Sequence, residues 1–390
     1  MIDRISIFGT GLLGGSVGLA LRAAGYKGSI VGVNRGPEQA RIALEMGAID
    51  SIAADPLEAA RQSQVVVLAV PVYATLDWME RLAGVLGPGQ LVTDVGSTKR
   101  MISEAAARLY NTPERAGFLP GHPMAGKERS GAALASADLF QGTVWLFTPW
   151  PVSRASSEAS AAGAEAPSSI CGISGPAEAV PLLQSRALQS NPGRIEGNVS
   201  GHDFEPALSS PKGAEDAAKA SGALAPGQDS ATEALKGHDF SRGEDATKDK
   251  GALAPEGASE ASKELMSEWR KWVAAMGSRS LDLDPVRHDE MVAWVSHLPQ
   301  FLATSLSSLL EEEIGEAPEL KDVGGRALRE MTRLGASPYS MWRDIALTNT
   351  APVELALQKL EQRLALLREN LRTPILREEF DQANKFRKNC

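Results

Sequence analysis

The stretch Gly9-Thr10-Gly11-Leu12-Leu13-Gly14 decides the fold of this 390-residue chain. It follows a β-rich run at residues 5–8 and precedes a segment of helical composition. Gly9 permits a tight turn, Gly11 lets a ligand approach the backbone, and Gly14 lets the helix pack closely on the strand. The unpaired N–H groups at the start of such a helix bind anions. We therefore predict that a dinucleotide pyrophosphate contacts Gly9, Gly11, Leu12, Leu13 and Gly14.

Further β-rich runs follow this motif and alternate with segments of helical periodicity, such as residues 37–46. The runs lie at residues 29–33, 65–70, 91–94 and 144–147. This alternation predicts an α/β fold, a Rossmann-type, doubly wound parallel sheet with helices on both faces. A helix at 263–276 and a strand at 278–283 continue the same domain.

From about residue 285 onward the strand signals disappear, and wide apolar faces recur with a helical period at 290–313 and 353–372. They predict an all-helical second domain. Because these faces have few partners within the domain, we expect a homodimer.

A low-complexity segment interrupts the first domain at residues 151–261. Its only aromatic residues are Phe204 and Phe240, so it cannot form a core. The unit Gly201-His202-Asp203-Phe204 recurs as Gly237-His238-Asp239-Phe240. We interpret the segment as a duplicated, disordered insertion, and a metal or recognition motif is the alternative for its His-Asp pairs. The predicted order is a Rossmann domain at 1–150 and 262–284, the insertion at 151–261, a helical substrate-binding and dimerisation domain at 285–375, and a polar tail at 376–390.

Composition excludes several classes of protein. A net charge of -9 argues against nucleic-acid binding, which needs a basic face. Cys171 and Cys390 are the only cysteines, so neither a disulfide framework nor a cysteine metal site is expected, and we predict no metal. The sequence contains neither a signal-peptide pattern nor eighteen consecutive apolar residues. We expect a cytoplasmic protein without a membrane partner.

The residue after the second strand selects the coenzyme in dinucleotide-binding folds, and here it is Asn34. Without a carboxylate at this position a 2′-phosphate is not repelled, and Arg35 offers it a planar cation. We therefore predict NADP in preference to NAD, with a solvated Arg35 as the alternative. Pro71 and Tyr73 follow the third strand and are either walls of the coenzyme site or turn and packing residues.

Two segments carry the candidate chemistry. Ser97, after the strand at 91–94, offers a small hydroxyl beside a glycine. His122 lies in Gly121-His122-Pro123-Met124, where glycine and proline predict a loop. A neutral imidazole beside a nicotinamide can take a hydroxyl proton while a hydride leaves the same carbon. A wholly buried His122 would instead be a packing residue. The sequence thus indicates a dehydrogenase.

With these motifs, the chain resembles the prephenate dehydrogenase family of tyrosine biosynthesis, which includes the arogenate dehydrogenases. The resemblance spans nearly all of the chain except the insertion. It rests on motifs that occur in one order: residues 9–15, 94–99, 121–126 with Glu128 and 130–131, then 296–299, 332–333 and 341–345. The family reaction is the oxidative decarboxylation of prephenate to 4-hydroxyphenylpyruvate.

The resemblance implies roles for five residues. His122 would accept a hydrogen bond or proton from the ring hydroxyl of the substrate, and Ser97 would orient that hydroxyl. His297 and Arg333 would hold carboxylates, and Glu128 would line or gate the pocket. From the residues alone, His297 on an apolar helix is typical of a core histidine. Arg333 follows Glu330 by one helical turn, which is typical of a surface ion pair.

Some features depart from the family pattern and leave the substrate open. Many relatives carry an acid where Asn34 stands, and some carry a histidine where this chain has Gln300, so prephenate and arogenate both fit the sequence. Two functions outside this family also fit it, a β-hydroxyacid dehydrogenase that uses Lys99 and a non-enzymatic NADP sensor. We interpret His288 as a helix-start residue. We expect neither an ACT-type regulatory domain nor a chorismate mutase portion.

Overall fold

The computed structural model describes residues 1–149, 257–315 and 317–389. The predicted insertion lies outside the described residues up to position 256, together with its repeats, His202 and His238. Cys171 and Cys390 lie outside them as well.

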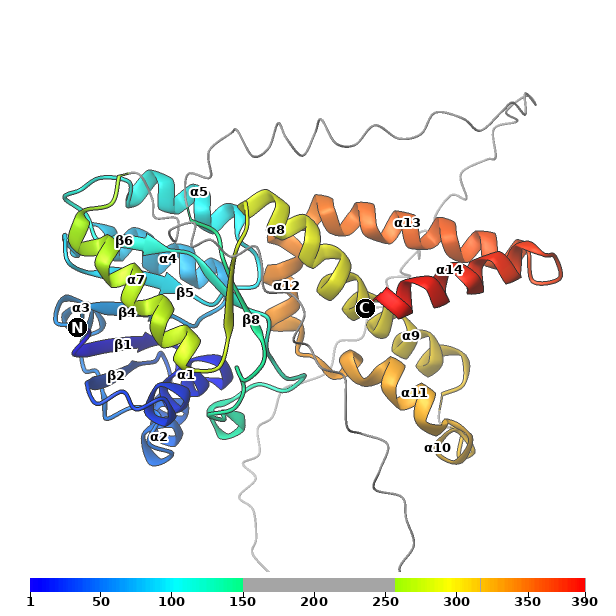
Figure 1. Ribbon diagram of the computed structural model, residues 1–390. Helices are drawn as coiled ribbons and strands as arrows, with labels where there is room; N and C mark the ends of the chain where they lie inside the picture. Colours follow the sequence, from blue (N-terminus) through cyan, green and yellow to red (C-terminus); the bar gives the residue numbers. More distant parts are fainter. Residues whose placement is uncertain (150–256, 316, 390) are drawn as a thin grey trace, which may run out of the picture. The chain divides into compact units, whose positions relative to one another are not determined.

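The first part of the chain forms a six-stranded parallel sheet with the strand order β3-β2-β1-β4-β5-β6 (Figure 1). Its strands are β1 (Arg4–Phe8), β2 (Ser29–Val33), β3 (Ser51–Ile52), β4 (Val65–Leu68), β5 (Leu91–Asp94) and β6 (Gly117–Leu119). This is the strand order of doubly wound dinucleotide-binding folds, and its direction reverses between β1 and β4. The predicted fold class is confirmed.

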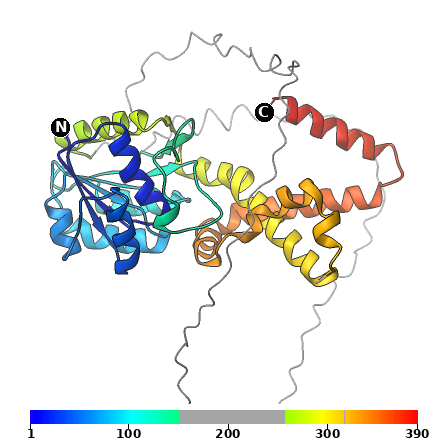
Figure 2. The ribbon, with the colours of Figure 1, turned by 90° about the horizontal axis from the view of Figure 1, so that it is seen from below.

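Side chains of the strands other than the exposed β3 are divided between two separate apolar cores. Ile5 and Ile7 pack with α1 (Leu12–Ala23), α2 (Pro37–Glu45) and α7 (Glu260–Ala275) on one face. Phe8, Val66 and Leu68 face the opposite core with α3, α4 and α5. The bounds of these three helices are α3 (Pro56–Arg61), α4 (Val72–Ala83) and α5 (Arg100–Leu109). Helices therefore cover both faces of the sheet, as the two views show (Figures 1 and 2).

A second, three-stranded sheet corrects two details of the sequence prediction. Here β8 (Val144–Phe147) pairs in antiparallel fashion with β7 (Gly121–Pro123) and in parallel with β9 (Arg279–Asp282). The predicted strands at 144–147 and 278–283 thus form, but they do not extend the main sheet. The loop predicted around His122 is wrong, because this residue lies in β7 and its backbone pairs with Leu146 of β8. A short 3₁₀ turn, η1 (Ala132–Leu134), lies between these strands in sequence.

The remainder of the described chain is helical, in agreement with the prediction (Figure 2). Its elements are α8 (Pro285–Val292), η2 (Ala293–His297), α9 (Leu298–Glu313), α10 (Leu320–Val323), α11 (Gly325–Thr332), η3 (Arg333–Ala336), α12 (Tyr339–Thr348), α13 (Thr350–Glu369) and α14 (Ile375–Asn389).

The predicted single helix at 290–313 is interrupted by the π-helical turn η2. Pro299 explains the interruption, because a proline within a helix has no N–H to donate to the preceding turn. His297 lies at the end of this turn, and π turns are frequent at functional sites.

The polar tail predicted after residue 375 is wrong in one respect, because this segment forms helix α14. Glu378 lies in its first turn, and Arg387 and Lys388 lie in its last turn, so both ends have charges that complement the helix dipole. Polarity alone did not indicate this helix. Among the described residues, no helix is long and apolar enough to cross a membrane. The boundaries between the domains stay predictions.

Candidate active site

The glycine motif lies at the carboxyl edge of the main sheet, between β1 and α1. Gly9 has a φ of 88°, and a Cβ there would collide with the backbone of Ala69. A Cβ on Gly14 would collide with the carbonyl of Gly9, whereas one on Gly11 would meet open space. No side chain caps the start of α1, so the first backbone N–H groups of this helix have no side-chain partner. The loop therefore fits a dinucleotide phosphate.

The predicted coenzyme-selecting residues lie at the same edge of the sheet. The side-chain oxygen of Asn34 accepts a hydrogen bond of 2.9 Å from the Thr10 N–H, which fixes the loop against the end of β2. Arg35 is exposed. Pro71 precedes α4 as its N-cap residue, and Tyr73 in the first turn of α4 is 42% exposed. Each of these four residues follows β2 or β4, where a ligand at this edge can reach it.

Asp94, the last residue of β5, connects the loop that carries Ser97 to the strand that carries His122. Its Oδ2 accepts the Gly96 N–H at 2.8 Å, and its Oδ1 accepts the Gly121 N–H at 3.1 Å. The same carboxylate forms an ion pair with Lys99, and both side chains are fully buried. Burial lowers the pKa of Lys99, and the Asp94 carboxylate opposes that shift. The pair holds two predicted site segments together.

His122 is 8% exposed and contacts a second histidine. Its Nδ1 lies 2.9 Å from Nε2 of His288, and Nδ1 of His288 lies 2.8 Å from Oδ1 of Asp289. Burial lowers the pKa of His122 well below its usual range, with His288, Lys99 and His297 adding repulsion. Burial likewise lowers the pKa of His288, although Asp289 opposes it. Both imidazoles are therefore neutral at physiological pH.

His297 belongs to the same buried cluster through Asn349. The amide nitrogen of Asn349 donates to the carbonyl oxygen of Asp289 at 2.8 Å and lies 3.1 Å from Nδ1 of His297. Because a carbonyl only accepts, this atom is the amide nitrogen, and its second hydrogen points to Nδ1. Burial lowers the pKa of His297 to about 4. The neutral ring therefore carries its proton on Nε2, and the rings of His297 and Trp342 pack in a T-shaped arrangement with their centroids 5.8 Å apart.

Glu128 and Arg333 form an ion pair although 205 positions separate them in the sequence. The Arg333 side chain is 60% exposed and that of Glu128 is 26% exposed. Glu330, the sequence neighbour that suggested a helix-surface pair, instead binds Arg326. The structure thus connects Arg333 to another predicted site residue.

Two family models match this chain in succession. Residues 17–157 match the nucleotide-binding domain of prephenate dehydrogenase, and residues 284–386 match its dimerization domain. Together the two matches cover more than half of the chain. The chain belongs to the prephenate dehydrogenase family.

Curated members of the prephenate dehydrogenase family align with part of the chain. A prephenate dehydrogenase of Bacillus subtilis (strain 168) is 38% identical over 150 residues, which are 38% of this chain and 40% of that protein. A prephenate dehydrogenase of Lactococcus lactis is 36% identical over 148 residues, or 38% of this chain and 41% of that protein. The aligned part thus spans less than half of the length of these relatives.

Solved structures from the prephenate dehydrogenase family are similar in fold to this chain. The prephenate dehydrogenase of A. aeolicus, solved with hydroxyphenyl propionate and NAD+, has a TM-score of 0.61 at 21% identity, covering 100% of this chain and 96% of that one. The arogenate dehydrogenase of Synechocystis has a TM-score of 0.57 at 20% identity, covering 99% of both chains. At these identities the likeness shows the fold.

The sequence alone did not indicate several residues of the buried cluster. His288 does lie near the start of α8, where Asp284 caps the helix and Pro285 begins it, but its interpretation as a helix-start residue overlooked the contact with His122. No motif pointed to Asp289 or Asn349, and Lys99 was a candidate only for another class of enzyme. The segment at 287–290 is not among the motifs that carry the family resemblance, and no local pattern reports a contact across 166 positions.

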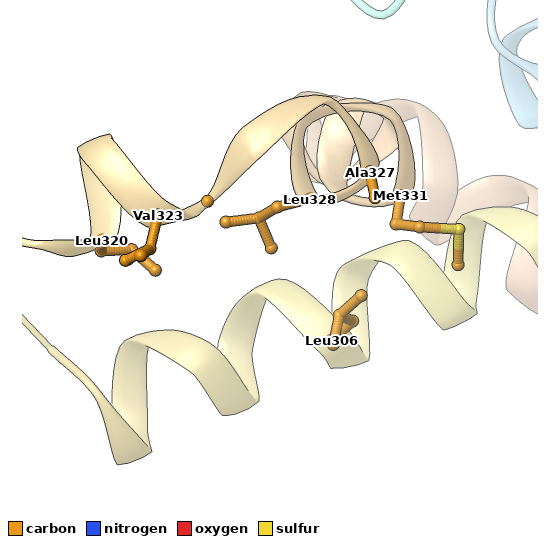
Figure 3. A pocket seen from close by; sticks show the side chains of 7 residues that line it. Leu306, Leu320, Val323, Ala327, Leu328 and Met331 are labelled. Carbon is orange, nitrogen blue, oxygen red and sulfur yellow. The ribbon is translucent and has the colours of Figure 1, made fainter.

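An apolar groove of about 470 Å³ lies elsewhere in the helical part (Figure 3). Leu306 of α9 faces Leu320, Val323, Leu328 and Met331 of α10 and α11 across it. No residue of the predicted site lines it, so we do not assign it to catalysis. Within the described part of the chain, no group of three His, Cys, Asp or Glu side chains is placed to hold a metal ion.

Proposed function

We propose that this protein oxidises and decarboxylates prephenate to 4-hydroxyphenylpyruvate with reduction of a nicotinamide dinucleotide. The observation that carries the proposal is the neutral, hydrogen-bonded His122 beside the carboxyl edge of a dinucleotide-binding sheet. Family membership and the names of the curated relatives support this substrate.

His122 is proposed as the base. Prephenate carries a hydrogen and a hydroxyl on C4 of a cyclohexadiene ring, and transfer of the hydroxyl proton to Nε2 of His122 favours departure of the C4 hydride. A nicotinamide dinucleotide, when bound, supplies the acceptor for that hydride. The ring carboxylate leaves as carbon dioxide, its bonding electrons complete the aromatic ring, and the proton on His122 returns to the phenolate oxygen. Aromatisation makes the step strongly favourable.

Ser97 is proposed to orient the ring hydroxyl. It lies on the β5–α5 connection, which Asp94 holds against Gly121, the residue before His122. The Ser97 hydroxyl can donate a hydrogen bond to the oxygen of the substrate hydroxyl, while the hydrogen of that hydroxyl points to His122. This hydrogen bond would align the substrate hydroxyl with His122, the proposed base.

His297, Arg333 and Glu128 are proposed to hold and enclose the substrate. Prephenate is a dianion, and the guanidinium of Arg333 suits a carboxylate because it can bind both oxygens. His297, neutral with its proton on Nε2, can donate to a second oxygen. Glu128 pairs with Arg333, so a substrate carboxylate would compete with Glu128 for the guanidinium. We therefore propose that Glu128 gates access to Arg333.

NADP is proposed as the preferred coenzyme, with NAD as the alternative. The residue at the end of β2 is the neutral Asn34, and the exposed Arg35 follows it. An amide does not repel a 2′-phosphate, and an exposed guanidinium attracts one.

The test is to incubate the protein with prephenate and NADP, to follow the reduced coenzyme by its near-ultraviolet absorption, and to identify the product. Formation of 4-hydroxyphenylpyruvate and carbon dioxide is the expected result. Arogenate, offered in parallel, should be turned over with a much lower kcat/KM. A higher kcat/KM for arogenate than for prephenate would make arogenate the substrate and leave the proposed chemistry unchanged. Oxidation without carbon dioxide release would indicate a β-hydroxyacid dehydrogenase. Absence of turnover with every donor would favour the NADP sensor and refute the proposal.

A homodimer is proposed through the helical part. Residues 284–386 match a dimerization domain, and this part exposes large apolar side chains. They include Val295 (59% exposed), Leu309 (53%), Leu355 (52%) and Leu364 (50%). Burial of such surface stabilises association. Light scattering at micromolar concentration should give twice the mass of one chain, and a monomeric mass would refute the dimer.

A further inference from the structure

Three side chains from two distant parts of the sequence form one continuous hydrogen-bonded series. It runs from Nδ1 of His122 to Nε2 of His288 at 2.9 Å, and from Nδ1 of His288 to Oδ1 of Asp289 at 2.8 Å. His288 is fully buried and Asp289 is 2% exposed. Water therefore cannot readily take the place of these hydrogen-bond partners, and each donor needs an acceptor within the protein.

Asp289 determines which atom donates and which accepts in each hydrogen bond of this series. Its Oδ1 accepts the backbone N–H of Lys99 at 2.7 Å, and its Oδ2 accepts that of Arg100 at 3.0 Å. Both groups lie at the N-terminus of α5, where the helix dipole also favours a carboxylate. With both oxygens acting as acceptors, Asp289 has no proton to offer. The Nδ1 atom of His288 must therefore carry the hydrogen and donate it.

The rest of the series follows from neutrality. A neutral imidazole has one N–H, so a His288 protonated on Nδ1 presents a lone pair on Nε2. Only a hydrogen on Nδ1 of His122 can satisfy that lone pair. His122, also neutral, then has its own lone pair on Nε2. We infer that His288 and Asp289 act as positioning residues that fix His122 in the tautomer whose Nε2 accepts a proton.

This tautomer matters for the proposed function, on which the inference rests. The opposite tautomer would present an N–H to the substrate hydroxyl and could not take its proton. The other titratable groups that act on His122 are Lys99, whose charge is paired with Asp94, and His297, which is neutral, so neither competes for the Nδ1 hydrogen of His122. Asp289 also joins the start of α5 to α8, so the orientation of His122 depends on contact between these two helices.

A matched pair of variants separates positioning from packing. His288→Leu introduces an apolar side chain of similar size, which offers no hydrogen-bond acceptor to His122. His288→Gln is polar and can place an oxygen near the former Nε2 position. We expect kcat with prephenate to fall at least about 100-fold in His288→Leu and no more than about tenfold in His288→Gln, with coenzyme affinity unchanged in both. If His288→Leu retains as much kcat as His288→Gln, His288 acts by packing and the inference is wrong.

Nuclear magnetic resonance of the ¹⁵N-histidine-labelled protein without substrate tests the same inference independently of turnover. At neutral pH, His122 and His288 should both carry their proton on Nδ1 and His297 should carry it on Nε2. In His288→Leu, His122 should no longer be held in a single Nδ1–H form. A wild-type His122 protonated on Nε2, or an Nδ1–H form unchanged by His288→Leu, overturns the inference. If prephenate proved not to be the substrate, the tautomers would still be those expected here. Failure of the proposed function can therefore be distinguished from failure of this inference.

Discussion

The ammonium group of Lys99 forms an ion pair with the carboxylate of Asp94, five residues earlier, and both side chains are inaccessible to solvent. Lys99→Met would leave the buried Asp94 charge without its partner. We expect the free energy of unfolding to fall by about 3–5 kcal/mol, as measured by chemical denaturation. Because Asp94 also binds the N–H groups of Gly96 and Gly121, the variant should lose activity as well.

The neighbouring residue provides the control for this substitution. Arg100 pairs with Glu104 at the surface, where their side chains are 61% and 57% exposed. Arg100→Met should therefore change stability by less than about 1 kcal/mol. Equal losses in the two variants would contradict the importance of the buried pair.

Arg333→Ala should raise the KM for prephenate about 10- to 100-fold, because a charge-assisted hydrogen bond to a carboxylate contributes about 1.5–3 kcal/mol. The kcat should change much less, since the residue binds a part of the substrate that does not react. Steady-state kinetics with saturating coenzyme measures both constants. Arg326→Ala is the control, because Arg326 is an exposed arginine paired with Glu330. A KM that rises equally in both variants would reject a specific role for Arg333.

Asn34→Asp should shift coenzyme preference toward NAD. An aspartate at this position can still accept the Thr10 N–H, so the loop should keep its geometry while gaining a negative charge. We expect the ratio of kcat/KM for NADP to that for NAD to fall about tenfold or more. Arg35→Ala should move the ratio in the same direction. Arg41→Ala, which removes an exposed arginine paired with Glu45, should leave the ratio unchanged. A wild-type preference for NAD would refute the assignment.

Acid should destabilise the protein partly through His297. Its pKa is about 4 in the folded protein against 6.5 for the free side chain, so between these values the unfolded state binds more protons. Stability is therefore complete above pH 6.5 and decreases as the pH falls toward 4. Between pH 7 and pH 5 this residue alone should remove about 2 kcal/mol from the free energy of unfolding.

Denaturant titrations at the two pH values measure this loss, and His297→Asn should show a loss smaller by that amount. Above pH 7 the stabilities of the two proteins should run parallel, which serves as the internal control. An identical pH dependence in both proteins would show that His297 titrates normally when folded.

The predictable parts of the fold are those whose structure depends on residues close together in the sequence. The glycine motif after residues 5–8 and the alternating β-rich runs each report local geometry, and they were sufficient to predict a doubly wound parallel sheet. The strand β7 was missed because its three residues acquire extended structure only by pairing with β8. Helix α14 was missed because its polar surface hides the helical period.

The site was predictable only where a motif carried it. His122, Ser97 and Arg333 stood in recognisable segments, but the hydrogen bond from His122 to His288 joins positions that only the folded chain brings together. Likewise, Glu330 was the obvious partner of Arg333 by helical spacing, yet the folded protein supplies Glu128. The roles of these residues in catalysis stay predictions.

The most direct test of the account is the kcat of His122→Asn with prephenate, measured beside the affinity of the same variant for NADP. If His122 takes the hydroxyl proton, kcat should fall by about 10²- to 10⁴-fold while the coenzyme dissociation constant stays within about twofold of the wild-type value. A kcat close to that of the wild-type protein would contradict the account.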